Sequence, residues 1–287
     1  MSTDVDHVLL TRFNLPSKGP ESYLRTRDGW LVDRVELFER YCLPSVENQT
    51  CSNFHWIIYF DPESPPWLKE KIHEWSADGV FVAIYREEVP QRDLVADIRA
   101  VTGARHTQLI STNLDNDDGL AVDFVERLQR ARSESPRTAI YLTQGLIKNA
   151  GRLYRRKDQD NAFCSVREDW SSVVTCWTDW HNRLALQMPV LEIAGDAAWL
   201  QVIHELNVSN RVRGRRTGPA QYLPIFGKML DDVIVPGVLE AAVENIWHIP
   251  KRTVRDAGRS AVKNLAMKVA GKDGLEKLKN RMQQAQK

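Results

Sequence analysis

The interpretation of this chain starts from one acidic stretch, Ser111-Thr112-Asn113-Leu114-Asp115-Asn116-Asp117-Asp118-Gly119. It follows a run that predicts a strand, Arg105 to Thr112, and precedes a pattern that predicts an amphipathic helix, Leu120 to Arg132. Asp115 and Asp117 alternate on a turning backbone, so both carboxylates can point at one hard divalent cation and leave its other positions for water and phosphate. The stretch therefore predicts a metal site at the end of a strand.

Two simpler interpretations of the same stretch must be weighed against a metal site. An EF-hand loop that begins at Asp115 would end correctly on Glu126, but its sixth position requires glycine and holds Leu120. The calcium-loop interpretation therefore fails. An acidic turn stays open as an alternative, because Asp, Asn and Gly are common turn formers. Asp118 in particular is placed to cap the predicted helix rather than to bind metal.

The composition is that of a folded globular protein with an uneven charge distribution. The 287 residues are 43% hydrophobic and 27% charged, and this length allows one large domain or two small ones. The net charge is +1, but residues 251–287 hold 11 Lys and Arg against 3 Asp and Glu, and residues 1–250 carry a net charge of −7. We therefore expect a mildly acidic body, residues 1–250, and a basic tail, residues 251–287.

The cysteines and the apolar runs bear on the compartment. Cys42, Cys51, Cys164 and Cys176 show no C-x-x-C spacing and lie in or beside apolar runs, which favours buried reduced thiols and a reducing cytosol. The first residues lack the pattern of a secretory signal, and no apolar run is long enough to span a bilayer. The sequence therefore predicts a cytoplasmic protein that is soluble or peripheral to the membrane.

The first half of the chain alternates between strand and helix patterns. Apolar runs predict strands, and helical spacing predicts the helices between them. The strands are expected at residues 7–13, 54–60, 80–85 and 107–111, and the helices at 31–41, 64–76 and 91–102. Such alternation predicts an α/β fold with a mostly parallel, doubly wound central sheet and helices on both faces.

The second half has a different pattern. Strand-like pieces at residues 139–147, 151–155 and 173–177 predict a small antiparallel addition. Two helices are predicted at 196–206 and 233–245, with a basic loop, residues 211–216, between them. We divide the body accordingly into two halves, residues 1–135 and 136–250.

Polar side chains follow the first two predicted strands. Thr11, Arg12 and Asn14 stand at the end of the first strand, and Asp61 follows the second. Open α/β sheets bind ligands outside the carboxyl ends of their strands. These residues are therefore predicted to contact a ligand together with the acidic stretch.

Four segments together carry a resemblance to a known family. They are Thr11-Arg12-Phe13-Asn14, Phe54-His55-Trp56-Ile57-Ile58-Tyr59-Phe60-Asp61, Asp115-Asn116-Asp117-Asp118 and Trp199-Leu200-Gln201-Val202-Ile203-His204-Glu205-Leu206-Asn207. Over about residues 6 to 210 the chain resembles a GT-A glycosyltransferase with its D-x-D motif, and it is similar to the bacterial putative rhamnosyltransferase family. The resemblance implies a Rossmann-like GT-A fold, with a nucleotide-binding half, residues 1–135, and an acceptor half, residues 136–250.

The resemblance also implies a metal site that holds Mn²⁺ or Mg²⁺. Asp117 would make the firmest metal contact, Asp115 would reach the metal and the ribose or sugar of the donor, and His204 would complete the metal shell. The alternative for His204 is a core histidine, because apolar residues surround it in the predicted helix.

This chain departs from the family pattern just before the acidic stretch. The resemblance leads us to expect an arginine there, and the chain has Asn113. Arg12 and Arg105 are the candidates to replace that contact with the donor phosphates.

An inverting transfer needs a base that takes the proton of the acceptor hydroxyl. Asp179 is the first candidate and His181 lies beside it, in a segment whose tryptophans can stack on sugar faces. Asp160 and Glu168 rank behind them. The alternative is that these tryptophans are core residues and that Asp179 caps a turn.

These inferences favour a metal-dependent glycosyltransferase that moves a sugar from a UDP-, dTDP- or GDP-sugar to a hydroxyl of a glycan, glycolipid or protein. Rhamnose is implied by the resemblance alone. Two other functions stay open: a metal-dependent phosphotransferase or nucleotidyltransferase with the same carboxylates, and a non-catalytic nucleotide-sugar-binding protein. A nucleic-acid partner is not expected, because the body is acidic and holds no recognised binding module.

The basic tail has apolar residues at helical spacing with Lys and Arg between them, as in Ala261-Val262-Lys263-Asn264-Leu265-Ala266-Met267-Lys268-Val269. A basic amphipathic helix can lie on an anionic membrane, here the inner face of the cell membrane. It can equally pack on the acidic body or pair with a second subunit. We therefore predict a helical tail that serves peripheral membrane contact or homodimerisation.

Overall fold

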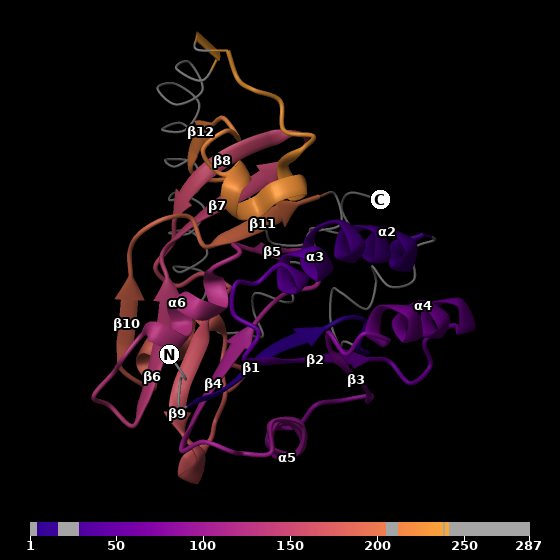
Figure 1. Ribbon diagram of the computed structural model, residues 1–287, viewed down its shortest axis with the longest axis vertical. Helices are drawn as coiled ribbons and strands as arrows, with labels where there is room; N and C mark the ends of the chain where they lie inside the picture. The colour runs from indigo at the N-terminus through magenta and orange to yellow at the C-terminus, as the bar shows by residue number, and fades with distance from the viewer. Residues whose placement is uncertain (1–4, 17–28, 205–211, 238, 241–287) are drawn as a thin grey trace, which may run out of the picture. The chain divides into compact units, whose positions relative to one another are not determined.

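The computed structural model describes residues 5–16, 29–204, 212–237 and 239–240 (Figure 1). Its central sheet has seven strands in the order β10-β6-β9-β4-β1-β2-β3. Every neighbouring pair is parallel except those of β9, which lies antiparallel between β4 and β6. The strands are β1 (Val5–Arg12), β2 (His55–Phe60), β3 (Val82–Tyr85), β4 (Gln108–Asn113), β6 (Arg137–Leu142), β9 (Ser165–Asp169) and β10 (Val190–Ile193). The predicted α/β class with a mostly parallel central sheet is confirmed.

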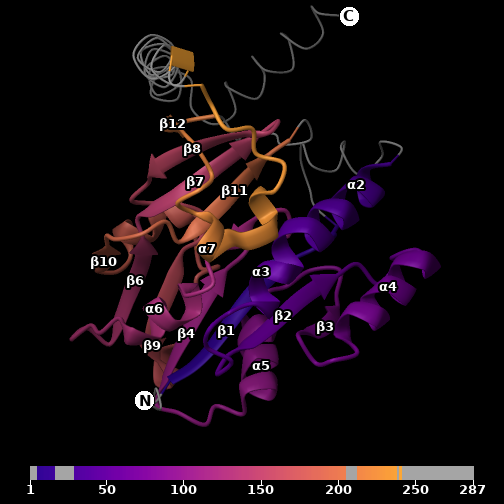
Figure 2. The same ribbon diagram turned by 45° about the horizontal axis from the view of Figure 1, so that its top comes forward.

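Helices cover both faces of this sheet, as the uninterrupted apolar strand sequences predict. Successive residues of a strand point to opposite faces, and Leu9 of β1 packs in one hydrophobic cluster while Leu10 packs in another. The cluster of Leu9 includes residues of α4 (Pro66–Ser76) and α6 (Phe124–Arg130). The cluster of Leu10 includes residues of α5 (Gln91–Thr102). Figure 2 shows how these helices flank the sheet.

A second sheet of five strands has the order β12-β8-β7-β11-β5. All its pairs are antiparallel except that of β7 with β11. It contains β5 (Gly119–Leu120), β7 (Gln144–Asn149), β8 (Arg152–Lys157), β11 (Trp199–Ile203) and β12 (Arg215–Thr217). Both views show this sheet at one end of the central sheet (Figures 1 and 2). Because β5 begins at the last residue of the acidic stretch, the stretch connects the two sheets.

The first helical region is longer than predicted. Helix α2 (Trp30–Leu37) passes into a π-helical turn, Phe38–Cys42, and then into α3 (Leu43–Glu47). Pro44 comes just after this π-helical turn, in which the Leu43 N–H donates to the Phe38 carbonyl five residues back, so the proline lies where the regular α-helical hydrogen-bond pattern is already interrupted. The chain therefore continues as helix to Glu47, past the predicted end at residue 41. A short helix, α7 (Leu223–Phe226), and 3₁₀ turns at Trp170–Ser172, His181–Leu186 and Gly227–Leu230 complete the helices described.

Several predicted elements of the second half are wrong. The helix predicted at residues 196–206 is strand β11, because short apolar runs fit either structure and here β5 and β7 lie on its two sides as partners. The strand predicted at 139–147 is two strands, β6 and β7, which belong to different sheets. Residues 173–177 form no strand, and β9 lies just before them.

Two predicted helices also start elsewhere or are missing. The helix predicted from Leu120 begins at Phe124, because Gly119 and Leu120 pair with β11 as β5. Residues 233–237 of the helix predicted at 233–245 are not helical, and most of the remainder lies outside the described residues.

The chain divides into two compact units, Met1–Val235 and Pro236–Lys287. The basic tail, residues 251–287, and Arg211 of the basic loop lie outside the described residues, so their predicted structures stay predictions. Within the described part of the chain, no helix combines the length and the apolar character that a membrane span requires.

Candidate functional site

The acidic stretch lies at the carboxyl ends of the two central strands, β1 and β4. The backbone N–H of Leu114 donates to the carbonyl of Leu10 at 3.0 Å, and Thr11 Oγ1 donates to the carbonyl of Leu114 at 2.8 Å. The indole of Trp56 donates to Thr11 Oγ1 at 2.9 Å. Thr11 is fully buried. Its hydroxyl therefore bonds the acidic stretch to β1 inside the protein, and it does not face a ligand as predicted.

Asn116, the middle residue of the D-x-D motif, points into the protein. Its Oδ1 accepts a hydrogen bond from Arg34 Nη1 at 2.8 Å, and its Nδ2 donates to the carbonyl of Phe13 at 3.1 Å. Arg34 Nη1 also donates to the Phe13 carbonyl at 2.9 Å. Asn116 is thus buried between Asp115, which is exposed, and Asp117, which is partly exposed. Sequence reasoning missed Arg34, because its partners lie far from it in the chain.

Asp118 is buried and belongs to the framework of the site. Its Oδ1 accepts the backbone N–H of Val202 in β11 at 2.8 Å. Burial and the neighbouring charges of Asp117 and Asp115 raise the pKa of Asp118 well above its ordinary value. Asp118 therefore joins the acidic stretch to β11, and it does not cap a helix, because β5 comes before α6.

Asp117 faces His204, which comes directly after β11. Asp117 Oδ2 and His204 Nε2 are 2.9 Å apart. Desolvation acts to raise the pKa of Asp117, but the hydrogen bond with His204 and the positive charge of Arg34 outweigh it and hold that pKa below its ordinary value. Asp117 is thus held as a carboxylate, and His204 stands at a strand end rather than on an apolar helix.

Asp115 is exposed and is oriented by Asn113, whose Nδ2 donates to Asp115 Oδ1 at 3.3 Å. Desolvation by the surrounding protein and the charge of Asp117 raise the pKa of Asp115. The Asn113 hydrogen bond and the charges of His181 and Arg12 oppose this rise. Asp115 is therefore a second carboxylate of the acidic stretch, and the side chains of His181 and Arg12 lie near it.

Asn14 and Asp61 fasten the ends of β1 and β2 to one another. Asn14 Oδ1 accepts the backbone N–H of Asp61 at 3.0 Å, and its Nδ2 donates to Ser64 Oγ at 3.0 Å. Asp61 Oδ1 accepts the backbone N–H of Glu63 at 2.8 Å, which forms the turn that leads into α4. The structure thus brings both residues to the predicted edge of the sheet, where they are buried and shape the loops.

The two arginines proposed for the donor phosphates lie at opposite edges of the sheet. Arg12 is exposed at the end of β1, and its guanidinium carbon lies 3.8 Å from the centre of the Trp177 ring. Arg105 precedes β4. The pKa of His55, at the start of β2, is lowered mainly by burial of that histidine and further by the positive charge of Arg105. Parallel strands begin at one edge and end at the other, so Arg105 is about a strand length, roughly 20 Å, from the acidic stretch. The structure thus does not bring Arg105 to the acidic stretch, where the sequence predicted it to lie.

Asp115, Asp117 and His204 offer the kinds of ligand atom that a divalent ion needs. Carboxylate oxygens and an imidazole nitrogen suit Mn²⁺, and Mg²⁺ is usually held by one or two carboxylates plus water and phosphate. A cation would also relieve the repulsion between the two carboxylates. Among the residues that the structure describes, no group of three or more His, Cys, Asp or Glu side chains could hold an ion by itself. The ligand atoms are thus of the right chemical kind, but the described side chains do not by themselves form a three-ligand site, and water and substrate phosphates would have to complete one.

The carboxylate of Asp179 is engaged within its own segment. Its Oδ1 accepts the backbone N–H of Trp180 at 2.8 Å, and its Oδ2 accepts a hydrogen bond from Gln187 Nε2 at 2.8 Å. Arg183 Nε lies 3.6 Å from the same Oδ2. These contacts are those of a residue that holds a turn, as the structural alternative described.

His181 is fixed at both its backbone and its ring. Its carbonyl accepts a hydrogen bond from the Tyr141 hydroxyl, and its Nδ1 bonds to the carbonyl of Asp160. A carbonyl only accepts, so Nδ1 must carry a proton, and whenever the ring is neutral its lone pair is on Nε2. The charge of His181 acts on Asp115. His181 therefore lies close enough to the acidic stretch to act on one of its carboxylates.

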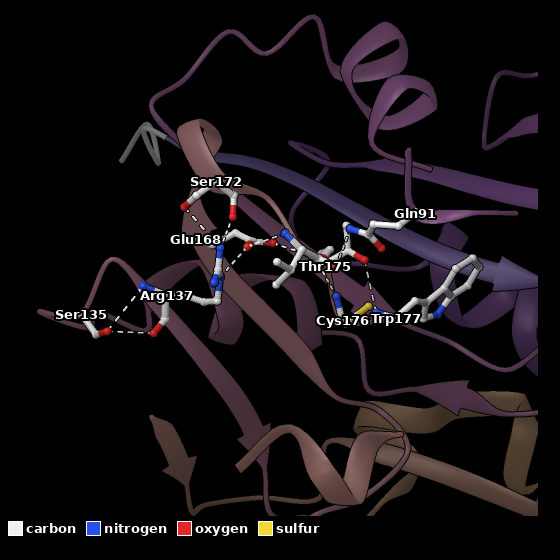
Figure 3. A network of polar contacts seen from close by, with 10 residues as sticks. Gln91, Ser135, Arg137, Glu168, Ser172, Thr175, Cys176 and Trp177 are labelled. Atoms are coloured by element: carbon white, nitrogen blue, oxygen red, sulfur yellow. Dashed lines mark hydrogen bonds and ion pairs between the residues drawn. The ribbon is translucent and has the colours of Figure 1, made fainter. Parts of the chain in front are cut away.

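The lower-ranked candidates for the base differ in exposure. Asp160 is exposed and close to His181. Glu168 is fully buried and accepts hydrogen bonds from Arg137 Nε at 2.9 Å and from the backbone N–H groups of Val174 and Thr175 at 2.9 and 2.8 Å (Figure 3). A carboxylate that is held in this way cannot reach an acceptor hydroxyl, so Glu168 is excluded as the base.

Comparison with solved structures finds similar chains among transferases. TarS of S. aureus is 8% identical with a TM-score of 0.43, and the match covers 69% of this chain and 37% of TarS. The inositol-1-phosphate CTP transferase of T. maritima is 13% identical with a TM-score of 0.38, covering 70% of this chain and 91% of that one. GalNAc-T7 with UDP, GalNAc and Mn²⁺ is 10% identical with a TM-score of 0.39, covering 72% and 45%. The chain thus spans about a third of the length of TarS.

Comparison with sequence families gives a more direct result. No curated protein matches this chain. The model of one family, described as "Putative rhamnosyl transferase", matches residues 6–216, which include every strand of both sheets except the first residue of β1 and the last residue of β12. The chain therefore belongs to the putative rhamnosyl transferase family, a family of glycosyltransferases.

Proposed function

We propose that this protein is a metal-dependent, inverting glycosyltransferase that moves a sugar from a nucleotide-sugar donor to a hydroxyl of a glycan, glycolipid or protein. The observation that carries the proposal is the pairing of Asp117 with His204, beside Asp115, at the carboxyl ends of β1 and β4. Family membership supports sugar transfer, and rhamnose is the sugar that the family description implies.

Transfer from such a donor leaves negative charge on a nucleoside diphosphate, and this charge must be neutralised as the bond to the sugar breaks. Mn²⁺ or Mg²⁺ held by Asp115, Asp117 and His204 would supply Lewis-acid chemistry there. Arg12 is an exposed cation near Asp115 and is our candidate for a direct phosphate contact. Arg34 favours the ionised form of Asp117 and so keeps this ligand ready for the metal.

His181 is our candidate for the base. The carbonyl of Asp160 holds the Nδ1 proton, so the Nε2 lone pair is available to take the proton of the acceptor hydroxyl. The same carbonyl would stabilise the imidazolium that forms. Asp179 serves in this proposal to hold the segment, because its oxygens are bonded to Trp180 and Gln187.

Trp180 is our candidate for an acceptor contact. It follows Asp179 and precedes His181, and 73% of the residue is exposed. An exposed indole offers a flat apolar face, and such faces pack well against rings that are apolar on one side. An acceptor sugar that rests on Trp180 would bring a hydroxyl towards His181.

The products of donor turnover test this function against its alternatives. With Mn²⁺ and a UDP-, dTDP- or GDP-sugar, the protein should slowly release free sugar and nucleoside diphosphate. A nucleotidyltransferase would instead release pyrophosphate from a nucleoside triphosphate. A non-catalytic binding protein would release neither, and nucleotide would stabilise it without Mn²⁺.

Two variants separate the metal site from the base. Asp117→Ala should lose the Mn²⁺-dependent rise in Tm with donor, because the ligand carboxylate is gone. Each protein is compared with its own Tm without Mn²⁺, since Asp117 is only 17% exposed and its contact with His204 is also lost. His181→Ala should keep donor binding and lose transfer by about 10²- to 10⁴-fold. Donor binding by Asp117→Ala at wild-type strength would exclude Asp117 as the ligand, and normal transfer by His181→Ala would exclude His181 as the base.

A further inference from the structure

Trp177 connects two charged groups of the candidate site. The guanidinium carbon of Arg12 lies 3.8 Å from the centre of its ring. Its indole Nε1 donates to Asn113 Oδ1 at 2.7 Å. Asn113 in turn donates to Asp115 Oδ1 at 3.3 Å. One side chain thus lies against a candidate phosphate ligand and bonds to the partner of a candidate metal ligand.

The indole also decides which way the Asn113 amide faces. An indole N–H can only donate, so the oxygen of Asn113 must face Trp177 and the NH₂ group must face the other way. That NH₂ group donates both to Asp115 Oδ1 and to the carbonyl of Ala162, the latter at 2.9 Å. If the amide were turned over, its oxygen would face a carboxylate and a carbonyl, which only accept. The Trp177 N–H therefore holds Asn113 as a donor to Asp115.

A buried carboxylate fixes the segment that carries Trp177. Glu168 accepts the backbone N–H groups of Val174 and Thr175, which hold the chain just before the indole (Figure 3). Thr175 has a φ of +65°, which a non-glycine residue rarely adopts, and its Oγ1 accepts the backbone N–H of Trp177 at 3.3 Å. The N–H of Cys176 donates to Ser111 Oγ of β4 at 2.9 Å. This network explains how an irregular segment can hold an indole in one place.

We propose that Trp177 is a positioning residue for the transfer site: through Asn113 it orients Asp115 towards the metal, and with its ring it seats Arg12 for the donor diphosphate. The inference rests on the proposed function, because it gives Asp115 and Arg12 the roles proposed there. Residues that orient a metal ligand typically change metal affinity about 10- to 100-fold when they are replaced.

Trp177→Phe tests the hydrogen bond alone, because it removes the N–H and keeps an aromatic ring under Arg12. Trp170→Phe is the matched control. Trp170 also donates its N–H to a side-chain oxygen, Asp6 Oδ2 at 2.7 Å, and has Arg99 over its ring at 4.7 Å. Asp6, however, lies near the start of β1, at the other edge of the sheet. The probe is Mn²⁺ alone, titrated into the full chain and followed by electron paramagnetic resonance.

We expect Trp177→Phe to bind Mn²⁺ about 10-fold or more weakly, and Trp170→Phe to bind it within twofold of the wild type. Asn113→Ala should show the same loss as Trp177→Phe. The double variant should bind no more weakly than Asn113→Ala, because residues that act through one another are not additive. The Tm of both tryptophan variants is measured as well. If both fall by a similar amount, loss of stability does not explain why only Trp177→Phe binds Mn²⁺ more weakly.

The affinity for inorganic pyrophosphate without metal tests whether the Trp177 ring positions Arg12. Trp177→Leu, which removes the ring, should weaken pyrophosphate binding as much as Arg12→Gln does, and Trp177→Phe should leave it unchanged. Mn²⁺ binding by Trp177→Phe within twofold of the wild type, or additive losses in the double variant, would overturn the inference alone. A wild-type chain that binds no Mn²⁺ would overturn the proposed metal site and this inference with it.

Discussion

His7 is a buried histidine in β1, beneath the candidate site. Its Nε2 lies 3.0 Å from Thr112 Oγ1. Burial, with a contribution from the charge of Arg167, lowers the pKa of His7 to about 3. An unfolded chain would titrate this group near its ordinary pKa of about 6.5. Between pH 6.5 and about pH 3, His7 is therefore protonated in the unfolded state and neutral in the folded state. The free energy of unfolding decreases as the pH falls through this range.

We predict that His7→Gln weakens this dependence of stability on pH. His7 should contribute a loss of about 1.4 kcal/mol per pH unit as the pH falls from about 6 to about 4, and glutamine can bond to Thr112 without titrating. Urea unfolding of both proteins at several pH values measures the difference, in which the carboxyl groups common to both cancel. A constant difference between wild type and variant from pH 7 to pH 4 would contradict the assignment to His7.

Individual site residues differ in how far the sequence could predict them. Asp115 and Asp117 follow from the spacing of the acidic stretch, and His204 follows from the resemblance, since no local pattern distinguishes it from a core histidine. Arg34 and Trp177 could not be found in this way. Arg34 meets Asn116 across 82 residues of sequence and Trp177 meets Asn113 across 64. Such contacts exist only once the sheet has brought strand ends together.

At the scale of elements, strand β11 depends on a glycine in its neighbour β7. A Cβ built on Gly145 would lie 2.0 Å from Cδ2 of Trp199, the first residue of β11. Trp199 is itself fixed, because it stacks on Phe163 with ring centres 5.2 Å apart and donates to the carbonyl of Leu142 at 2.8 Å. The missing side chain at position 145 thus makes room for the indole.

We predict that Gly145→Ala lowers the free energy of unfolding by about 1 to 3 kcal/mol, as overpacking commonly does, and weakens Mn²⁺ binding. The second effect follows because Trp199 must move and His204 is attached to the same strand. Gly237→Ala is the control, since among the described residues its Cβ would come no closer than 4.0 Å to another atom. Denaturant unfolding and Mn²⁺ titration measure both effects. Unchanged stability of Gly145→Ala would show that Trp199 is not confined as described.

The strands of the first half were predictable because strands buried on both faces read as continuous apolar runs, and one helix had clear start and end signals. Helix α5 has the predicted bounds, Gln91–Thr102, and ends at Gly103 in the left-handed conformation that glycine favours. The second half was harder, because β6 and β7 are separated by Thr143 alone and yet belong to different sheets. Which sheet a strand joins is decided by its partners, and these are not visible in its own sequence.

At the scale of the whole molecule, charge is divided unevenly along the chain. Residues 1–250 carry a net charge of −7 and residues 251–287 a net charge of +8. A basic segment with apolar residues at helical spacing suits an anionic membrane surface, where each Lys or Arg contributes about 1 kcal/mol. We infer that the tail brings the enzyme to an anionic lipid surface, which would suit a lipid-linked acceptor.

We therefore predict that the full chain binds vesicles that contain about 30% anionic phospholipid. Salt should weaken this binding, because it screens the charges. Replacing Lys263, Lys268 and Lys272 together with glutamine should weaken it by about 3 kcal/mol, or about 100-fold. The matched control replaces three exposed cations of the body, Lys69, Arg92 and Arg152, with glutamine, and should change binding little. Vesicle co-sedimentation measures all three proteins. Equal losses in both triple variants would assign the effect to net charge and not to the tail, whereas salt-insensitive self-association of the unaltered chain without vesicle binding would favour a dimer contact instead.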